Sequence, residues 1–260
     1  MNWIEALILG IIQGLTEFLP VSSSGHLEIG KVLLGVELQD NLTFDIVVHA
    51  ATVCSTIVVF HKQIAGLFNG VVKLQWNSET QYIAKLLFSA VPVIFVGLFL
   101  EETVEGFFTG NLLLVGSMLL ITATLLAFTY FTKPRDKNIS FLDAFVIGIA
   151  QALAVMPGIS RSGATIATAL ILKNKREEAA RFSFLMVLLP ILGKAGLDIV
   201  SGEMTKDAIQ IFPLIIGFIG AFIVGLFACK LMIAIVNRSK LIYFAIYCVI
   251  VAILTLALST

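Results

Sequence analysis

The sequence predicts an all-helical protein that crosses a membrane several times and consists of two related halves inserted in opposite directions. Three observations predict this. Of the 260 residues, 58% are hydrophobic and only 13% are charged, whereas soluble domains carry about 25% charged residues. Several apolar runs approach the roughly 20 residues that a helix needs to cross a bilayer. One motif also recurs in both halves of the chain.

Six apolar segments are long enough to cross the membrane. We expect spanning helices at 44–61, 82–100, 111–131, 182–200, 210–229 and 241–258. Two further regions, 4–35 and 142–173, each hold two shorter apolar pieces separated by Gly, Ser and Pro. Pieces of about 12 to 15 residues are too short to cross. We therefore expect each of these pairs to form a re-entrant helical hairpin.

The two broken regions repeat one pattern. GIIQGLTEFLPVSSSGH, from Gly10, aligns without a gap with GIAQALAVMPGISRSGA, from Gly148. This predicts a first repeat at 1–138 and a second at 139–260, each a re-entrant pair followed by three spans. Because three crossings is an odd number, the second repeat must be inverted relative to the first.

Loop charges predict the orientation. Twelve Lys and Arg residues lie in the loops 62–81, 132–143, 173–181 and 229–240. One lies in the loops 36–43, 101–110 and 201–209. The positive-inside rule places the first set in the cytoplasm, so both termini lie outside. The hairpins then enter from opposite sides and meet near the midplane, where inverted repeats with broken helices place their sites.

Composition also argues against several classes of protein. The formal net charge is zero, so no overall positive field favours nucleic acid as a partner. Cys54, Cys229 and Cys248 lie in apolar runs and predict small buried side chains rather than disulfides or a zinc site. The N-terminus lacks the basic region and cleavage site of a removable signal peptide.

The second hairpin tip, PGISRSGAT, has the residues of a phosphate site. Arg161 stands between Ser160 and Ser162, and Gly163 and Thr165 follow at the start of a short apolar helix. An arginine at membrane depth is costly, so its default interpretation is functional. Its guanidinium fork suits phosphate, and a helix N-terminus also favours an anion. The structural alternative is that Arg161 pairs with a buried carboxylate while the serines cap the helix.

The first tip offers the residues of a cation site. Gln13 and Glu17 are four positions apart, so they share one face of a helix. Carboxylate and amide oxygens are ligands that Mg²⁺ and Ca²⁺ prefer. A divalent cation would stabilise the charge that develops in phosphoryl transfer.

The serines and the histidine of the first tip leave the nucleophile open. His26 could act as general acid or base, or as the nucleophile itself. Ser23 could instead attack after activation by His26, or His26 could activate a water. Ser22 and Ser24 join the candidate phosphate ligands. The structural alternative is that these residues only cap a helix after Pro20.

Asp45 and His49, four positions apart at the start of an expected span, are interpreted mainly as an interfacial pair without a catalytic part. Small residues such as Gly10 and Gly14, and the glycines of the fifth span, predict close helix packing. Such faces permit a homodimer without requiring one.

The motifs QGLTEFLPVSSSGH and PGISRSGAT resemble the two signatures of the undecaprenyl-diphosphate phosphatase family, the bacitracin-resistance type. The resemblance covers essentially the whole chain. It implies a multi-pass hydrolase of the bacterial cytoplasmic membrane that removes the terminal phosphate of a C55 polyprenyl diphosphate and returns the monophosphate carrier to peptidoglycan synthesis. It also implies a divalent cation, bacitracin resistance and a site open to the outer face.

Several residues of this chain fall on those signatures. The family motif E/Q-x-x-x-E covers Gln13 and Glu17, and since Gln is the weaker cation ligand, the metal role is expected to rest on Glu17. The serine-glycine-histidine stretch covers Ser22, Ser23 and His26. The second signature covers Ser160, Arg161, Ser162 and Thr165.

A competing function is transport of an anion or of the polyprenyl phosphate lipid. Inverted repeats with broken helices are a transporter architecture. A carrier would need Arg161 and the helix ends, but it has less use for Glu17 and His26 beside a cluster of serines. Phosphate release in detergent, without any gradient, distinguishes the two functions.

Overall fold

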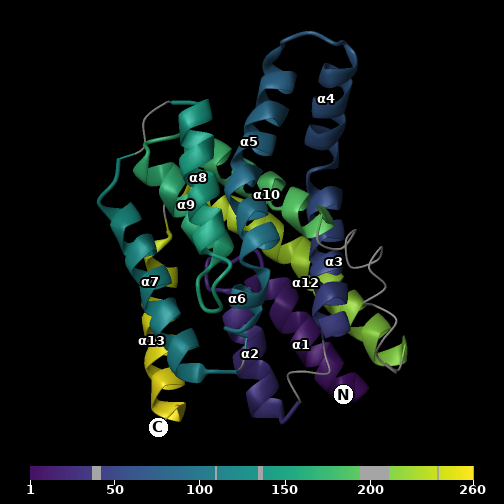
Figure 1. Cartoon of the computed structure of the whole chain (residues 1–260), viewed down its shortest axis with the longest axis vertical. Coiled ribbons are helices and arrows are strands. Elements are labelled where there is room, and N and C mark those ends of the chain that lie inside the picture. Colours follow the sequence, from purple (N-terminus) through teal and green to yellow (C-terminus); the bar gives the residue numbers. More distant parts are fainter. Residues whose placement is uncertain (37–41, 109, 134–136, 194–210, 239, 260) are drawn as a thin grey trace.

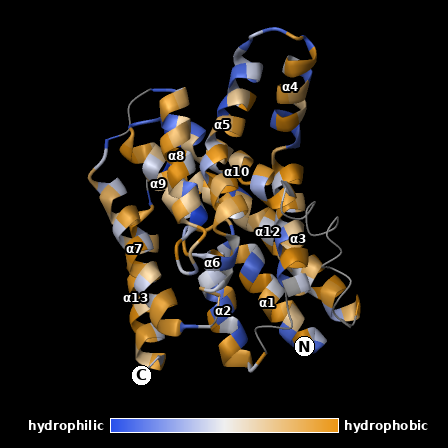
Figure 2. Cartoon of the chain, viewed as in Figure 1, coloured by the Kyte–Doolittle hydropathy of each residue, from blue (hydrophilic) through white to orange (hydrophobic). Residues whose placement is uncertain are grey.

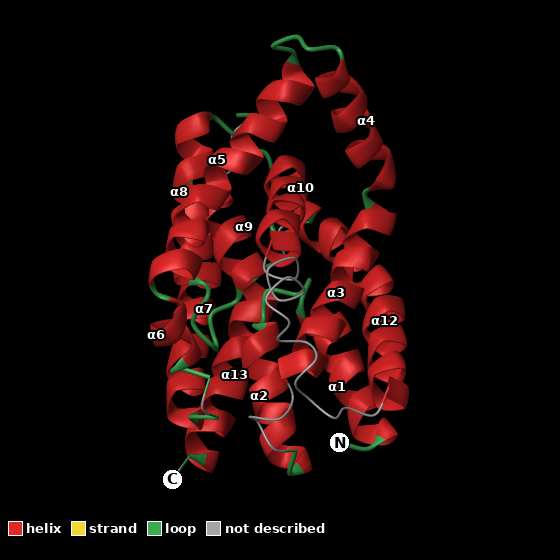
Figure 3. Ribbon diagram, turned by 45° about the vertical axis from the view of Figure 1, so that its right-hand side comes forward, coloured by secondary structure: helices red, strands yellow, loops and turns green. Residues whose placement is uncertain are grey.

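The computed structural model describes residues 1–36, 42–108, 110–133, 137–193, 211–238 and 240–259. Within these ranges the protein consists of helices and loops, without strands (Figure 3). The helices are α1 (Trp3–Thr16), α2 (Ser23–Leu34), α3 (Leu42–Val59), α4 (His61–Val72), α5 (Ser78–Phe99), α6 (Glu101–Glu105), α7 (Leu112–Tyr130), α8 (Phe141–Leu153), α9 (Arg161–Ile171), α10 (Arg176–Met186), α12 (Ile211–Asn237) and α13 (Ile242–Leu258). This all-helical structure is that of a polytopic membrane protein.

Three helices, α5, α7 and α12, are each long and apolar enough to cross a membrane. They cover three of the expected spans, although α12 continues beyond 229 to Asn237. Hydrophobic residues dominate the helices (Figure 2), and many large apolar side chains are exposed. A soluble protein would bury such surface, whereas lipid accepts it.

The other expected spans differ in detail. Helices α3 and α4 pass the same test only together, because the chain bends by 75° between them, at Phe60. Helix α13, at 17 residues, is a shorter apolar helix. Helix α10 covers the start of the expected span 182–200, residues 188–193 are helical as well, and residues 194–200 lie outside the described residues.

The two expected hairpins are the pairs α1–α2 and α8–α9. Helix α1 begins with a capping box formed by Asn2 and Glu5, and α8 begins with one formed by Ser140 and Asp143. Such boxes satisfy backbone N–H groups that the first turn leaves free. Each first helix ends before a proline-containing loop, at Thr16 and at Leu153. A serine then caps the second helix of each pair.

Each hairpin packs against a long helix from the other half of the chain. Helix α1 lies along α12, and α8 lies along α5. Both contacts depend on a glycine: a Cβ at Gly10 would collide with the backbone of Gly217, and a Cβ at Gly148 with the backbone of Ser89. Small residues therefore let these helix backbones approach closely, as is common in membrane proteins.

The tips of the two hairpins meet inside the molecule. Gly25 lies against Gly158, and Gly163 lies against Pro20. The hydroxyl of Ser162 donates a hydrogen bond of 3.1 Å to the carbonyl of Leu19 in the other tip. Figure 1 shows α1 and α2 in the half that holds both termini, and α8 and α9 in the half toward the turn between α4 and α5. The hairpins thus approach one another from opposite ends.

Candidate active site

Glu17 is the centre of a polar cluster at the first tip. It follows α1 directly as its C-cap residue, and its side chain is 9% exposed. Its Oε2 accepts hydrogen bonds from Ser23 Oγ at 2.6 Å and from Gln13 Nε2 at 2.9 Å. The short bond from Ser23 has the geometry of a hydroxyl nucleophile beside its general base.

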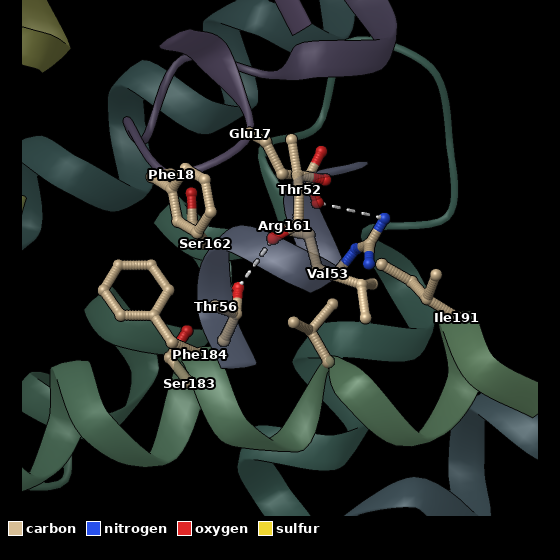
Figure 4. A pocket seen from close by; sticks show the side chains of 11 residues that line it. Glu17, Phe18, Thr52, Val53, Thr56, Arg161, Ser162, Ser183, Phe184 and Ile191 are labelled. Atoms are coloured by element: carbon tan, nitrogen blue, oxygen red, sulfur yellow. Dashed lines mark hydrogen bonds and ion pairs between the residues drawn. The ribbon is translucent and has the colours of Figure 1, made fainter. Parts of the chain in front are cut away.

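Arg161 brings a positive charge from the second tip to the same cluster. It is the first residue of α9, and its Nη2 lies 3.8 Å from Glu17 Oε1. Figure 4 shows the guanidinium and the carboxylate facing each other at the edge of a pocket. At this separation the guanidinium keeps donors for a further anion. Opposite charges interact more strongly here than in water because the surroundings are apolar.

The imidazole of His49, on α3, faces Glu17 from another side. Its Nε2 lies 3.8 Å from Glu17 Oε2, and its Nδ1 lies 2.7 Å from the carbonyl oxygen of Asp45. The sequence alone assigned His49 no part in the site. The available signal was a polar stripe on α3, since Thr52 and Thr56 follow His49 at positions i+3 and i+7.

The pocket lies where the two hairpins meet α3 and α10. It is lined by Glu17, Phe18, Thr52, Val53, Thr56, Arg161, Ser162, Ser183, Phe184, Val187 and Ile191. The carboxylate, the guanidinium and four hydroxyl groups make up its polar part. The rest is apolar, so the pocket suits a small, highly charged group attached to an apolar molecule.

The loops that carry these residues are held in special backbone conformations. Ser22, the N-cap of α2, is buried and has a φ of 72°, which costs a non-glycine residue about 1–3 kcal/mol. Its Oγ accepts from Gly25 N at 3.2 Å. In the second tip, Gly158 supplies the positive φ, at 96°. Thr122 of α7 holds that loop by donating to Gly158 O and accepting from Ser160 N.

The remaining candidate phosphate ligands surround the two helix starts. The hydroxyls of Ser22 and Ser24 lie 3.4 Å apart, and those of Ser160 and Ser162 lie 3.3 Å apart. Ser160 accepts from the backbone N–H of Gly163. Helices α2 and α9 therefore both point their N-termini toward the meeting point of the tips, which favours an anion there.

Thr165 lies one turn further into α9. It shares a short hydrogen bond with Ser183 of α10 and also donates to the carbonyl of Arg161. Ser183 itself lines the pocket and was not found by sequence reasoning, although the alignment of the two repeats pairs it with Asp45.

His26 lies on a different side of α2. Its Nδ1 is 2.8 Å from Ser22 O, and its Nε2 is 2.9 Å from the hydroxyl of Tyr247 on α13. The two rings also stack, with centroids 5.7 Å apart. Both ring nitrogens of His26 thus face other groups, whereas His49 Nε2 lies 3.8 Å from Glu17 Oε2. Among the described residues the structure therefore brings His49, rather than His26, to Glu17.

The donor set beside Glu17 suits a divalent cation. Gln13 is fully buried, and its Oε1 has no hydrogen-bond partner among the described residues. An amide oxygen and a carboxylate are oxygen ligands of the kind that Mg²⁺ and Ca²⁺ take. Among the residues that the structure describes, no three His, Cys, Asp or Glu side chains converge to hold a metal. A cation would therefore need further ligands from water or from substrate.

A family model and several curated relatives agree on the family that this chain resembles. A family model described as bacitracin resistance protein BacA matches residues 6–254. A relative from Bacteroides fragilis (strain ATCC 25285), named undecaprenyl-diphosphatase, is 56% identical over 263 residues, which cover 100% of this chain and 99% of the relative. One from Parabacteroides distasonis with the same name is 57% identical and covers 99% and 98%. One from Christiangramia forsetii, also with that name, is 51% identical and covers 96% of each chain.

Proposed function

The chain belongs to the bacitracin resistance protein BacA family, and we propose that the cluster around Glu17 is the place where it hydrolyses undecaprenyl diphosphate. The activity is that of an undecaprenyl-diphosphatase, the name carried by relatives more than 50% identical along the whole chain. The enzyme removes the terminal phosphate and returns undecaprenyl phosphate to use as a lipid carrier. Membership of the family also implies bacitracin resistance.

Two inverted repeats account for the way in which the site is assembled. The capping boxes of α1 and α8, at Asn2 and Ser140, occupy equivalent positions in the alignment of the two repeats. The contacts between tips are reciprocal in the same alignment, since Gly25 meets Gly158 while Gly163 meets Pro20. These pairings support six spans and two re-entrant hairpins that meet near the middle of the bilayer.

The charged part and the apolar part of the substrate bind in different places. The terminal phosphate lies between the Arg161 guanidinium and the N-termini of α2 and α9. Hydroxyls of the tips and of α3, such as those of Ser162 and Thr56, complete its hydrogen bonds. The prenyl chain stays among lipid tails against the apolar helix surfaces. The loop charges support an orientation with both termini outside, and the site then opens to the outer face of the cytoplasmic membrane.

The reaction starts at the hydrogen bond between Ser23 and Glu17. Glu17 takes the proton of the Ser23 hydroxyl, and the oxygen forms a bond to the terminal phosphorus. The bridging P–O bond then breaks, and undecaprenyl phosphate leaves with that oxygen and takes up the proton from Glu17. Glu17, ionised again, next takes a proton from water, whose oxygen attacks the phosphorus of the phosphoserine. The P–O bond to Ser23 breaks, the serine oxygen regains the proton from Glu17, and inorganic phosphate is released. Arg161 holds the negative charge that gathers on the transferred group, an effect worth several kcal/mol in an apolar site.

A divalent cation, held by Glu17 with Gln13 beside it, would neutralise charge on the diphosphate. The chain's own contribution is to hold the carboxylate in place: the amide of Gln13 and the hydroxyl of Ser23 both donate to Oε2. The tight packing of the two tips keeps bulk water away from this group.

The observation that carries the proposal is the 2.6 Å bond from Ser23 to Glu17, opposite Arg161. The test is phosphate release from undecaprenyl diphosphate by purified protein in detergent, with Mg²⁺, with Ca²⁺ and with EDTA. Metal-dependent release that Glu17→Gln, Ser23→Ala and Arg161→Lys each lower at least about 100-fold is the expected result. Ser117→Ala, on the exposed side of α7, is the matched control and should keep full activity.

Transport of an anion or of the lipid product is the second candidate, and the meeting of two broken helices at one site favours it. A folded protein that releases no phosphate under any of these conditions, but exchanges phosphate across vesicle membranes, would overturn hydrolysis in favour of transport.

A further inference from the structure

His49 is held with one ring nitrogen turned toward the catalytic carboxylate. A carbonyl oxygen can only accept, so the 2.7 Å contact with Asp45 O means that Nδ1 carries the hydrogen and donates it. Nε2 is then the free side of the ring, and it lies 3.8 Å from Glu17 Oε2. Metal-binding histidines are typically fixed in this way, with the other ring N–H donated to a carbonyl or a carboxylate.

The separation between the two groups also suits a shared ion. A direct hydrogen bond would bring the two atoms to about 2.9 Å. Two ligands that are each about 2.1 Å from one ion lie about 3.0 Å apart at a right angle and about 4.2 Å apart on opposite sides, and the 3.8 Å separation lies between these limits. The His49 side chain is 23% exposed, so the ring is not sealed off from a diffusing ion.

We propose that His49 Nε2 joins the Glu17 carboxylate and the Gln13 amide oxygen as a ligand of the divalent cation, with diphosphate oxygens of the substrate as further ligands. This inference rests on the proposed function and names the cation chemistry of the same site. Among the described residues no third His, Cys, Asp or Glu converges there, so the phosphates supply the remaining ligands. Cations in phosphate chemistry are commonly held by few protein groups together with the phosphates.

The nitrogen ligand has a consequence for metal preference. Oxygen-only sites suit Mg²⁺ and Ca²⁺, whereas imidazole raises affinity for later divalent metals. The chain should therefore bind Co²⁺ more tightly than Mg²⁺ or Ca²⁺, and should bind each of these ions much better when a diphosphate is present. Replacement of His49 by Gln should remove this preference and weaken Co²⁺ binding at least about tenfold, since loss of an outer-shell partner alone costs that much.

The test is pulsed electron paramagnetic resonance of full-length protein in detergent, with Mn²⁺ and methylenediphosphonate as probes. The spin echo should show coupling to a ¹⁴N nucleus, which changes to the ¹⁵N pattern when histidine is ¹⁵N-labelled. The chain has three histidines, so variants can assign the signal. His49→Gln should lose it, whereas His26→Gln and the exposed His61→Gln should keep it, and His61→Gln should also keep full activity.

Bound Mn²⁺ without nitrogen coupling in the wild type would overturn the proposal and leave His49 as an ion-pair partner of Glu17. Coupling that persists in His49→Gln would overturn it as well. The ¹⁵N labelling needs no substitution, so it tests for a histidine ligand even if His49→Gln fails to fold. Coupling that persists in both His26→Gln and His61→Gln then assigns that ligand to His49, whereas loss of coupling in either would overturn the proposal. Phosphate release measured on the same samples distinguishes failure of the ligand assignment from failure of the proposed function. Normal release without nitrogen coupling refutes only the ligand assignment. Nitrogen coupling without release refutes only the hydrolase.

Discussion

The two hairpin tips share a scaffold and differ in charge. Both place a serine as the N-cap of the second helix, Ser22 in one and Ser160 in the other, with its hydroxyl bonded to a glycine N–H three positions on. In both, that hydroxyl also lies within 3.4 Å of a second serine hydroxyl. The backbone arrangement of the cap is thus the same in the two halves.

The side chains that carry charge are not shared. In the alignment of the two repeats, Glu17 corresponds to Val155, and Ser23 corresponds to Arg161. Gln13 donates to Glu17, whereas its counterpart Gln151 is buried and has no partner for either amide atom among the described residues.

This difference shows how an internal repeat can make an asymmetric site. Two copies of one loop supply two helix N-termini that face a common point. One copy then carries the carboxylate and the hydroxyl, and the other carries the guanidinium. Neither tip alone could hold a phosphate and also activate a nucleophile.

The largest expected effect is loss of either opposite charge. Glu17→Gln and Arg161→Lys should each lower kcat/KM about 10³-fold, since one removes the base and the other the fork that binds phosphate. The double variant should lose little more than either single one, because groups that act as a unit are not additive. The measurement is phosphate release at matched protein stability. Nearly full activity in Arg161→Lys would refute the division of labour between the tips.

The two neighbouring serines of the first tip provide the next comparison. Ser23 donates to Glu17, while the hydroxyl of Ser24 lies beside that of Ser22. Ser23→Ala should lower kcat about 100-fold or more. Ser24→Ala should lower it only about three- to tenfold, the effect of one ordinary hydrogen bond. Phosphate release at saturating substrate measures both, and equal losses in the two variants would argue against Ser23 as the nucleophile.

The glycines at the helix crossings test the symmetry of the scaffold. Gly10→Ala and Gly148→Ala should each lower the free energy of unfolding by about 1–3 kcal/mol, because the new methyl group meets backbone of the facing helix. Thermal unfolding in detergent measures this. Gly66→Ala, on α4 with open space around it, should be neutral or stabilising. A large effect at only one of the two crossings would speak against equivalent packing.

The smallest effects are expected at the two glutamines. Gln13→Leu should lower kcat about tenfold, because Glu17 loses a hydrogen-bond donor. Gln151→Leu should leave activity unchanged and keep or raise stability, because it removes a buried amide without a described partner. Phosphate release and thermal unfolding of the pair give both values. A loss of activity in Gln151→Leu would reveal a functional role in the second tip.

Much of the fold could be predicted from hydropathy and length. The helices α5, α7 and α12 and the broken pairs α1–α2 and α8–α9 lie where the apolar runs predict them. A segment that crosses lipid must be a long apolar helix, and this requirement can be recognised from the composition of the segment itself. The bend between α3 and α4 was not predicted, because the apolar run continues through Phe60 without Gly or Pro.

The site was predictable only in part. Glu17 and Arg161 are costly charges in lipid, so the residues alone predict that the two tips carry a site, and the structure brings these two side chains together. Which imidazole faces Glu17 depends on tertiary packing. His26 follows the serines directly, but one ring nitrogen reaches Tyr247 on α13, while His49 approaches from α3.

The physical reason is that membrane burial and helix packing determine different features of the protein. Burial in lipid acts on each segment separately, so a segment's own residues determine whether it spans, breaks or carries a costly charge. The direction in which a side chain points depends on how helices distant in sequence pack against one another, as Gly10 on Gly217 and Ser162 on Leu19 do here. The amino-acid order is therefore enough to predict a membrane protein with two broken helix pairs, whereas the packing of the helices brings their tips together and selects the side chains that surround Glu17.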